Sequence, residues 1–335
     1  MTDHPPGFPR PLGAHPRASR VGLGAWAFGR TGWGVQDDRD SRAAILRAVE
    51  AGVSWIDTAA VYGDGHSERL VGRTLAELSE PSRPLVFTKG GLRVDRSTGA
   101  TVRDLRPASL RRECEASLRR LGVDRIDLYQ LHWPVDEALV VEQAWETLGE
   151  LQAEGKIRWA GVSNFDVPLL ERCAAQRPID AVQLSLSLLR RDSGRDVLPW
   201  AADHGVDALV YSPLESGLLS GRFSTKRLQS LPEGDWRRER EQFKGGSFER
   251  ALALVERLEP IAADLDVSLT ELAITWTLAW PGVSAAIVGA RTPAQAEGWA
   301  RASSLSLEQS ALDAIAKALE ETGAGSGPAH PWRSS

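Results

Sequence analysis

Short runs rich in β-branched residues recur eight times along the 335-residue chain, and a stretch with the apolar spacing of an amphipathic helix follows each of them. This alternation is typical of parallel strands joined by helices, because two neighbouring parallel strands need a long crossover between them. The predicted strands are Val21–Gly24, Ser54–Asp57, Leu85–Lys89, Ile126–His132, Ile157–Ser163, Ile179–Leu184, Asp207–Tyr211 and Ala285–Val288.

Capping signals support the helices between and after these strands. Thr292-Pro293 has the pattern of an N-cap followed by proline at the first helical position. Ser268-x-x-Glu271 and Ser306-x-x-Gln309 have the spacing of capping boxes, which predicts extra helices near the C-terminus. Eight βα units in about 300 residues favour a closed (β/α)8 TIM barrel of the α/β class over an open sheet.

No linker divides the chain, so we predict a single domain over residues 1–335, with an ordered core of about 20–321 and flexible ends. Residues 223–246 are highly charged and carry no periodic pattern, and we interpret them as a long insertion after the seventh strand. The loops 29–37 and 90–106 and the C-terminal tail are the other segments expected to shape a substrate pocket.

Composition narrows the class of partner. The net charge is −5 and the arginines are scattered among acidic residues, so the sequence predicts no nucleic-acid partner. The two cysteines, Cys114 and Cys173, lie in stretches predicted to be helical and outside any CxxC or His-rich spacing, so neither a disulfide framework nor a metal site is predicted. No apolar run approaches the roughly 18 residues of a membrane span. These features predict a cytoplasmic protein that binds a small molecule, with no membrane partner, and no feature predicts a particular oligomeric state.

Ionisable residues follow three consecutive predicted strands at the points where those strands end. Asp57 ends the second strand, Tyr62 lies in the loop after it, Lys89 ends the third and His132 ends the fourth. The carboxyl ends of barrel strands form one rim, where the active sites of such barrels lie. An ammonium beside a phenol favours the phenolate and lowers its pKa, so Lys89 is expected to tune Tyr62 for proton transfer. Asp57 would hold Lys89 protonated, and His132 would orient a substrate oxygen.

The motifs around these residues resemble those of the aldo-keto reductases, in particular the bacterial branch. The resemblance is carried by SWIDTAAVYGDGHSE from Ser54, FTK from Phe87, DLYQLHWP from Asp127 and GVSNF from Gly161, in that order along about residues 20–302. It implies a carbonyl reductase or alcohol dehydrogenase that uses NADPH or NADP⁺, with NADH also possible. In that family the matching residues make Tyr62 the general acid, Lys89 and Asp57 its tuning pair, and His132 the hydrogen-bonding partner of the substrate.

The resemblance also implies the cofactor site. Ser163, Asn164 and Gln183 match the ligands of the nicotinamide carboxamide, and Tyr211 matches the ring that stacks on the nicotinamide. The loop after Tyr211 resembles the family's pyrophosphate loop, where small residues let backbone amides approach phosphates; its implied ligands are Ser212, Pro213, Leu214, Ser216, Gly217, Leu218 and Gly221. Gly289, Arg291 and Gln295 match the adenosine end, where Arg291 is the predicted ligand of the 2′-phosphate.

Three tryptophans fall in segments expected to border the substrate pocket: Trp26, Trp33 and Trp133. An aromatic lining suits an apolar, aromatic or sugar-like carbonyl compound. The sequence does not choose among these substrates, nor between reduction and oxidation as the direction in the cell.

Several competing functions are excluded by motif. None of the three tyrosines has lysine four residues later, which excludes the Tyr-x-x-x-Lys of short-chain dehydrogenases. Neither a GxSxG elbow nor an HExxH motif is present, which disfavours a serine hydrolase and a metalloprotease. Gly22-x-Gly24-x-x-Ala27 formally fits a dinucleotide fingerprint, but no clear helix follows it.

Two other functions remain open at this point. Lys89 at a strand end is also the position of a Schiff-base lysine, which would make the protein an aldolase-type lyase. A regulatory subunit that binds the cofactor without turnover is the second alternative.

Overall fold

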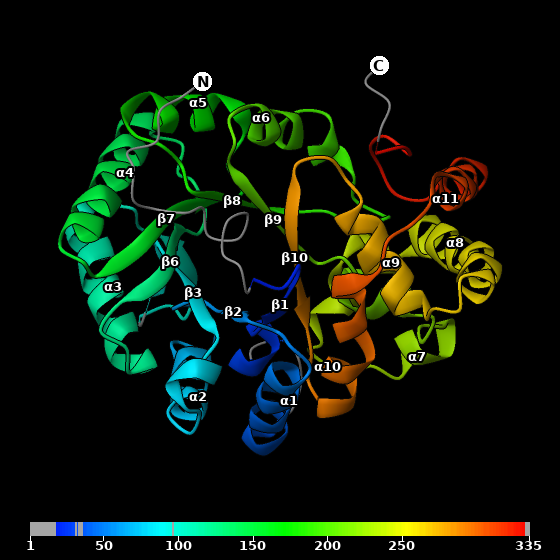
Figure 1. The fold of residues 1–335 in the computed structure, drawn as a ribbon, viewed down its shortest axis with the longest axis horizontal. Helices are drawn as coiled ribbons and strands as arrows, with labels where there is room; N and C mark the ends of the chain where they lie inside the picture. The colour runs from blue at the N-terminus through cyan, green and yellow to red at the C-terminus, as the bar shows by residue number, and fades with distance from the viewer. Residues whose placement is uncertain (1–17, 31, 33–35, 96, 332–335) are drawn as a thin grey trace.

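The computed structural model describes residues 18–30, 32, 36–95 and 97–331. Eight parallel strands close into a barrel in the order β1-β10-β9-β8-β7-β6-β3-β2, with helices around the outside (Figure 1). The strands are β1 (Val21–Gly24), β2 (Trp55–Asp57), β3 (Leu85–Gly90), β6 (Ile126–Leu131), β7 (Ile157–Ser163), β8 (Ala181–Ser185), β9 (Asp207–Tyr211) and β10 (Val283–Gly289). Each overlaps one predicted strand, and the predicted (β/α)8 barrel is confirmed.

Helices lie between the strands along the chain, as expected, and further helices follow the last strand near the C-terminus. They are α1 (Asp38–Glu50), α2 (His66–Leu75), α3 (Pro107–Leu121), α4 (Ala138–Ala153), α5 (Val167–Gln176), α6 (Val197–Asp203), α7 (Thr225–Gln229), α8 (Gly245–Asp264), α9 (Leu269–Leu278), α10 (Pro293–Ala300) and α11 (Gln309–Thr322). The capping box Ser268-x-x-Glu271 and the N-cap Thr292 are present. The predicted capping box at Ser306 is wrong, because α11 begins at Gln309 with Glu308 as its N-cap and no side-chain cap.

The lower interior of the barrel is filled by large apolar side chains. One residue from most strands points inward there, which closes the barrel to water at this level. The members of this layer are Trp55, Phe87, Leu128, Trp159, Ala181, Leu209, Ala285 and Ile287. The rings of Trp55 and Phe87 stack with centroids 5.0 Å apart. Gly22 of β1 faces the Trp55 ring, where a Cβ atom would lie 2.3 Å from it, so this glycine serves barrel packing rather than a phosphate turn.

Three segments have structure that the sequence did not predict. The loop 90–106 contains an antiparallel hairpin of β4 (Leu92–Val94) and β5 (Thr101–Arg103). The segment 223–246 is not devoid of structure: besides α7 it contains two short 3₁₀ helices, at Trp236–Glu239 and Glu241–Phe243. Near the C-terminus, Arg191 donates hydrogen bonds to the carbonyl oxygens of Gly327 and Pro328, at 3.3 and 3.0 Å.

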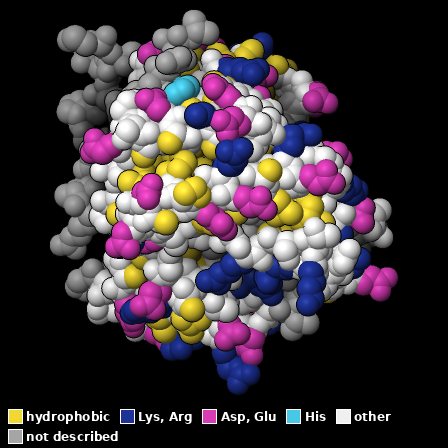
Figure 2. All heavy atoms as spheres, turned by 90° about the vertical axis from the view of Figure 1, so that its right-hand side faces the viewer, with side chains coloured by type: hydrophobic (Ala, Val, Ile, Leu, Met, Phe, Trp, Pro, Cys, Tyr) yellow, Lys and Arg dark blue, Asp and Glu magenta, His cyan; other side chains and the backbone are white. Residues whose placement is uncertain are grey.

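The outer surface mixes both signs of charge. Figure 2 shows the face that includes α7, α8 and α11, where acidic and basic side chains are interspersed, with one local group of basic side chains low in the view. Within the described residues, no helix combines the length and the apolar character needed to cross a membrane. In the same residues no cluster of His, Cys, Asp and Glu side chains has the arrangement of a metal site.

Candidate active site

A polar layer lies directly above the apolar floor of the barrel. Side chains two positions apart on a strand point to the same side, so the residues that follow the floor residues by two also face inward. They are Asp57 after Trp55, Lys89 after Phe87, Gln130 after Leu128, Gln183 after Ala181 and Tyr211 after Leu209. The strand period therefore gathers acid, base and amide groups at the carboxyl end of the barrel.

Lys89 and Asp57 form a buried ion pair in this layer. Their side chains are 1% and 4% exposed, and Lys89 Nζ lies 2.5 Å from Asp57 Oδ1. Lys89 Nζ also donates to the carbonyl oxygen of Thr58, at 3.0 Å. Burial works against the charge on Lys89, but the carboxylate of Asp57 and the phenol of Tyr62 outweigh it and raise the pKa of the lysine. Lys89 is therefore an ammonium at neutral pH.

This charge state disfavours the lyase alternative. A Schiff-base lysine attacks as the neutral amine, and enzymes that use one lower its pKa. The ion pair with Asp57 does the opposite at Lys89.

Tyr62 lies in the loop between β2 and α2, which two contacts hold against the barrel. Thr58 and Ser67 share a hydroxyl hydrogen bond of 2.9 Å, and Ser67 Oγ donates to the carbonyl oxygen of Ala25. Gly29 lies so close to the Tyr62 backbone that a Cβ atom would come within 2.7 Å of it. The loop therefore carries Tyr62 to the mouth, where Lys89 Nζ lies 5.3 Å from the centre of its ring.

The pKa of Tyr62 differs from the sequence-based expectation. Burial raises the pKa of the phenol, and this outweighs the lowering by the Lys89 ammonium. Asp57 adds to the raising effect because its carboxylate offsets part of the lysine charge. In this structure Tyr62 is therefore a neutral phenol at physiological pH, and the predicted net lowering is wrong.

His132 stands across the mouth from Tyr62, with the two rings edge to face and their centroids 5.8 Å apart. It is buried, and burial together with the Lys89 charge holds its pKa well below the usual value of 6.5. The imidazole is thus neutral and carries one N–H donor. Among the described residues its Nδ1 atom has no hydrogen-bond partner, and the same holds for Nε2 of Gln130.

The residues matched to the nicotinamide site lie together on neighbouring strand ends. Tyr211 donates from its hydroxyl to Asn164 Oδ1 at 2.7 Å, and Asn164 Nδ2 donates to Ser163 Oγ at 3.0 Å. Asn164 has a left-handed backbone with φ of 63°. Gln183 donates through Nε2 to Asp57 Oδ2 at 2.9 Å and to Gln130 Oε1 at 3.1 Å. Gln183 thus connects the residues matched to the nicotinamide carboxamide with the Lys89–Asp57 pair.

The loop after β9 has the backbone geometry of an anion-binding turn. Several of its residues adopt positive φ, at Ser212, Glu215, Ser216, Gly217 and Gly221. Successive residues in such conformations turn backbone N–H groups into a concave nest that suits phosphate oxygens.

The side chains of this loop divide into two sets. Leu218 is fully buried in a cluster with Phe223, Phe243 and Phe248, so it anchors the loop through its side chain. Pro213 is buried, whereas Ser212, Leu214, Ser216 and Gly217 are partly exposed and Gly221 is exposed.

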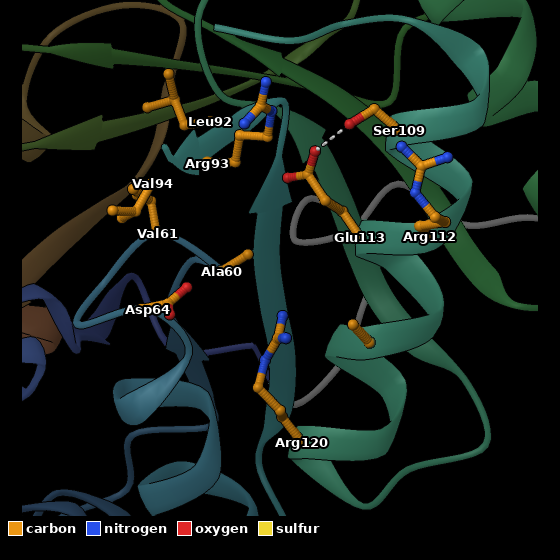
Figure 3. Close-up of a pocket in the computed structure, with 11 residues that line it drawn as sticks. Ala60, Val61, Asp64, Leu92, Arg93, Val94, Ser109, Arg112, Glu113 and Arg120 are labelled. Carbon is orange, nitrogen blue, oxygen red and sulfur yellow. Dashed lines mark hydrogen bonds between the residues drawn. The ribbon is translucent and has the colours of Figure 1, made fainter. Parts of the chain in front are cut away.

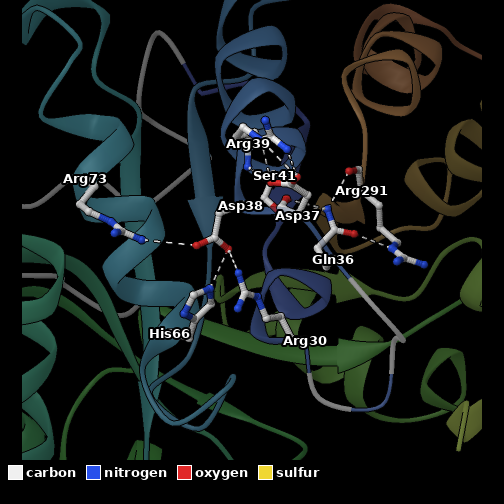
Figure 4. Close-up of polar contacts among 9 residues, drawn as sticks. All are labelled: Arg30, Gln36, Asp37, Asp38, Arg39, Ser41, His66, Arg73 and Arg291. Atoms are coloured by element: carbon white, nitrogen blue, oxygen red, sulfur yellow. Dashed lines mark hydrogen bonds and ion pairs between the residues drawn. The ribbon is translucent and has the colours of Figure 1, made fainter.

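At the adenosine end, Arg291 is held by two glutamines. Its backbone N–H donates to Gln295 Oε1 at 2.7 Å. Its Nε donates to Gln36 Oε1 at 2.7 Å, as Figure 4 shows. Gly289, at the end of β10, is exposed. Burial lowers the pKa of Arg291; Arg237 of the 223–246 segment lowers it further, and Asp235 of the same segment opposes this.

Aromatic side chains from two distant segments form one wall of the mouth. Trp26 is 39% exposed, and its ring centroid lies 6.5 Å from that of Tyr62 and 5.3 Å from that of Trp236. Trp133 is partly buried beneath the guanidinium of Arg103, 5.2 Å from its ring centre. Trp33, the third predicted pocket residue, lies outside the described residues. Trp236 was not predicted, because the segment around it carries no periodic pattern.

A separate cleft of about 210 Å³ lies behind the Tyr62 loop, between α3 and the β4–β5 hairpin (Figure 3). Glu113 of α3 borders it and accepts hydrogen bonds from Gly91 N at 3.0 Å and Ser109 Oγ at 3.2 Å. Burial raises the pKa of Glu113 to about 7, against the lowering by these two bonds; Asp104 adds to the rise and Arg120 opposes it.

Glu113 gives a pH-dependent prediction for stability. Because its folded-state pKa lies above the ordinary 4.5, its favourable contribution is full below that value and is lost as the pH rises through about 7. We expect Glu113→Gln, which keeps the acceptor for Gly91, to be more stable than the wild type by about 1–3 kcal/mol at pH 8.5. At pH 5 we expect most of this difference to vanish. Urea unfolding at the two pH values measures it.

The matched control is Glu115→Gln on the same helix, where hydrogen bonding to Lys156 lowers the pKa. That variant is expected to show no gain in stability relative to the wild type as the pH rises. An equal pH slope for the wild type and Glu113→Gln would show that Glu113 ionises normally.

Comparison with known proteins identifies the family. The model of the aldo/keto reductase family matches residues 20–320. The aldo-keto reductase YhdN of Bacillus subtilis is 35% identical over 306 residues, which is 91% of each chain. The NADH-specific methylglyoxal reductase of Escherichia coli is 32% identical, covering 83% of this chain and 87% of its own. The structure of a glycerol dehydrogenase from Gluconobacter oxydans is 36% identical with a TM-score of 0.84, covering 93% of this chain and 94% of the other.

These matches confirm the resemblance seen in the sequence motifs, and the barrel and its polar rim agree with it. The chain belongs to the aldo/keto reductase family and is an oxidoreductase that acts on carbonyl compounds or alcohols.

Proposed function

We propose that this enzyme reduces an aldehyde or ketone with NADPH, or oxidises the matching alcohol or sugar with NADP⁺, and that Tyr62 is its general acid and base. The observation that carries the proposal is the buried Lys89–Asp57 pair at the barrel mouth, with Tyr62 and His132 on either side of the space above it. The name of the Escherichia coli relative makes NADH the alternative cofactor.

The residues present fit a nicotinamide cofactor. Ser163, Asn164 and Gln183 would hold its carboxamide, and the buried Nε2 of Gln130 offers one further donor beside them. The ring of Tyr211 would support the nicotinamide. The positive-φ loop from Ser212 to Gly221 would hold the diphosphate, with Gly289, Arg291 and Gln295 at the adenosine end. When bound there, the cofactor supplies or accepts the hydride.

Tyr62 supplies the proton in the reduction. A carbonyl oxygen that gains negative charge needs a donor in its protonated form, and burial keeps Tyr62 a neutral phenol. Lys89 then stabilises the phenolate that remains, because its ammonium is fixed by Asp57 and Thr58. In the oxidation the same phenolate takes the proton from the alcohol, so that direction is expected to become faster as the pH rises.

His132 orients the substrate. Its low pKa keeps it neutral, so it donates one hydrogen bond to the substrate oxygen without competing with Tyr62 as an acid. The rings of Trp26 and Trp236 form the apolar wall on the other side. The substrate class is open between apolar, aromatic and sugar-like carbonyl compounds. The names of two relatives make methylglyoxal and glycerol the first compounds to test, together with glyceraldehyde, the aldehyde that corresponds to glycerol.

Parallel fluorescence titrations with NADPH and NADH test the cofactor assignment. The Trp26 ring lies 6.5 Å from that of Tyr62, and Trp236 lies 5.3 Å from Trp26, so a reduced nicotinamide bound within reach of Tyr62 is expected to quench their emission by energy transfer. We expect saturable quenching by both cofactors with the lower dissociation constant for NADPH. Quenching by neither would remove the proposed function.

A further inference from the structure

Arg291 makes two hydrogen bonds to Gln36, a residue that is not among those assigned to the cofactor site. Gln36, just before α1, is 255 positions away in the sequence and buried to 6% exposure. Its side-chain amide makes two bonds to Arg291: Oε1 accepts from Arg291 Nε at 2.7 Å, and Nε2 donates to the Arg291 carbonyl oxygen at 2.9 Å. Together the two bonds close a ring that fixes the arginine backbone and side chain at once.

The position of Gln36 is itself fixed by α1. Its Nε2 also donates to Ser41 Oγ at 2.9 Å, and Ser41 Oγ donates to the carbonyl oxygen of Asp37 at 3.1 Å. Asp37 is the N-cap of α1, where its carboxylate accepts from Arg39 N. The amide of Gln36 is therefore held by the rigid start of a helix rather than by a loop.

The effect on Arg291 is directional. A hydrogen bond at Nε fixes the plane of the guanidinium, and Figure 4 shows its far end directed away from Gln36. Arginine recognises phosphate through its planar fork of donors, so the fixed plane determines which oxygens it can reach. An arginine with this long side chain would otherwise lose rotamer entropy on binding, and prior ordering removes that cost.

We propose that Gln36 is a positioning residue that orients Arg291 toward the 2′-phosphate and so sets the preference of this enzyme for NADPH over NADH. The proposal rests on the proposed function, since it assumes that the cofactor site is the one described. Gln36 acts through Arg291 and contributes nothing to recognition of the rest of the cofactor. A purely structural link between α1 and the Arg291 loop predicts a different result, because it would weaken both cofactors alike.

The test compares Gln36→Met with the wild type. We expect the dissociation constant for NADPH to rise about tenfold, the effect of losing one charge-assisted hydrogen bond, with that for NADH changed by less than about twofold. Adenosine 2′,5′-bisphosphate and ADP, titrated by calorimetry, should show the same contrast without the nicotinamide half. Ser41→Ala removes the hydroxyl that holds Gln36 Nε2 and leaves both bonds to Arg291, so NADPH affinity should fall by less than in Gln36→Met while NADH affinity stays within about twofold of the wild type.

A double-mutant cycle separates positioning from a direct contact. Arg291→Met should weaken NADPH by about a hundredfold, and adding Gln36→Met to it should cause no further loss, because residues that act through one another are not additive. Equal loss of NADPH and NADH affinity in Gln36→Met, or additive losses in the double variant, would overturn the inference while the proposed function stands. A wild type that binds neither cofactor would overturn both.

Discussion

Carbonyl reduction by the Tyr62→Phe variant is expected to be slower than by the wild type by at least about two orders of magnitude, the range in which a positioned acid accelerates proton transfer. The substitution removes the hydroxyl, the only group of this side chain that can donate a proton, and keeps the ring beside Trp26 and His132. Binding of NADPH, measured by fluorescence quenching, should be retained. Steady-state oxidation of NADPH with glyceraldehyde or methylglyoxal measures the rate.

Tyr129→Phe is the matched control. Its hydroxyl is buried beneath Gly90, away from the mouth, and has no hydrogen-bond partner among the described residues. The rate of this variant should stay within about twofold of the wild type, since an unpartnered hydroxyl contributes little.

The wild-type rate of reduction should also be flat from about pH 6 to pH 9, because Tyr62 stays protonated and His132 neutral over that range. A Tyr62→Phe enzyme with nearly unchanged turnover would remove Tyr62 as the proton donor.

Lys89→Met should lose both stability and turnover. The substitution leaves the Asp57 carboxylate buried without its cation, which costs about 3–5 kcal/mol when one partner of a buried pair is removed. Turnover should fall by at least about two orders of magnitude as well, because nothing then stabilises the Tyr62 phenolate. Urea unfolding and steady-state kinetics measure the two losses separately.

The double variant Lys89→Met with Asp57→Asn tells the two roles apart. Without the stranded carboxylate, most of the stability is expected to return, whereas turnover should not recover. Lys156→Met is the surface control: it removes two partly exposed ion pairs, with Glu115 and Glu154, each worth at most about 1 kcal/mol. Recovery of turnover in the double variant would contradict the role of Lys89, and a stability loss no larger than that of Lys156→Met would contradict the buried pair.

The barrel could be predicted because its signals are local. Each strand is a short apolar run of its own, and the interior follows from a period of two residues: Phe87 and Lys89 face the same side, as do Ala181 and Gln183. The same rule would have found Gln130, which follows Leu128 by two positions and bonds to Gln183. Asp57, Lys89 and His132 could therefore be selected as candidates from the strand ends, and Tyr62 from the loop that follows Asp57. The net shift in the pKa of Tyr62 could not be predicted, since burial decides it.

The contacts that the sequence could not predict join segments far apart in the chain. Gln36 reaches Arg291 across 255 positions, and Trp236 reaches Trp26 from a segment without periodic pattern. No local spacing marks either pair, because both depend on how loops pack once the barrel has closed. The β4–β5 hairpin was missed for a similar reason: its strands are three residues each, too short for an alternating pattern to stand out.

Transfer of deuterium from the cofactor to the substrate tests the proposed reaction most directly. The wild-type enzyme is incubated with glyceraldehyde or methylglyoxal and with NADPH carrying deuterium in both positions at the nicotinamide C4, and the product is analysed by mass spectrometry. We predict an alcohol that has gained one deuterium at the former carbonyl carbon, formed far more slowly by Tyr62→Phe. An alcohol product without deuterium, or one formed equally fast by Tyr62→Phe, would contradict hydride transfer with Tyr62 as the acid.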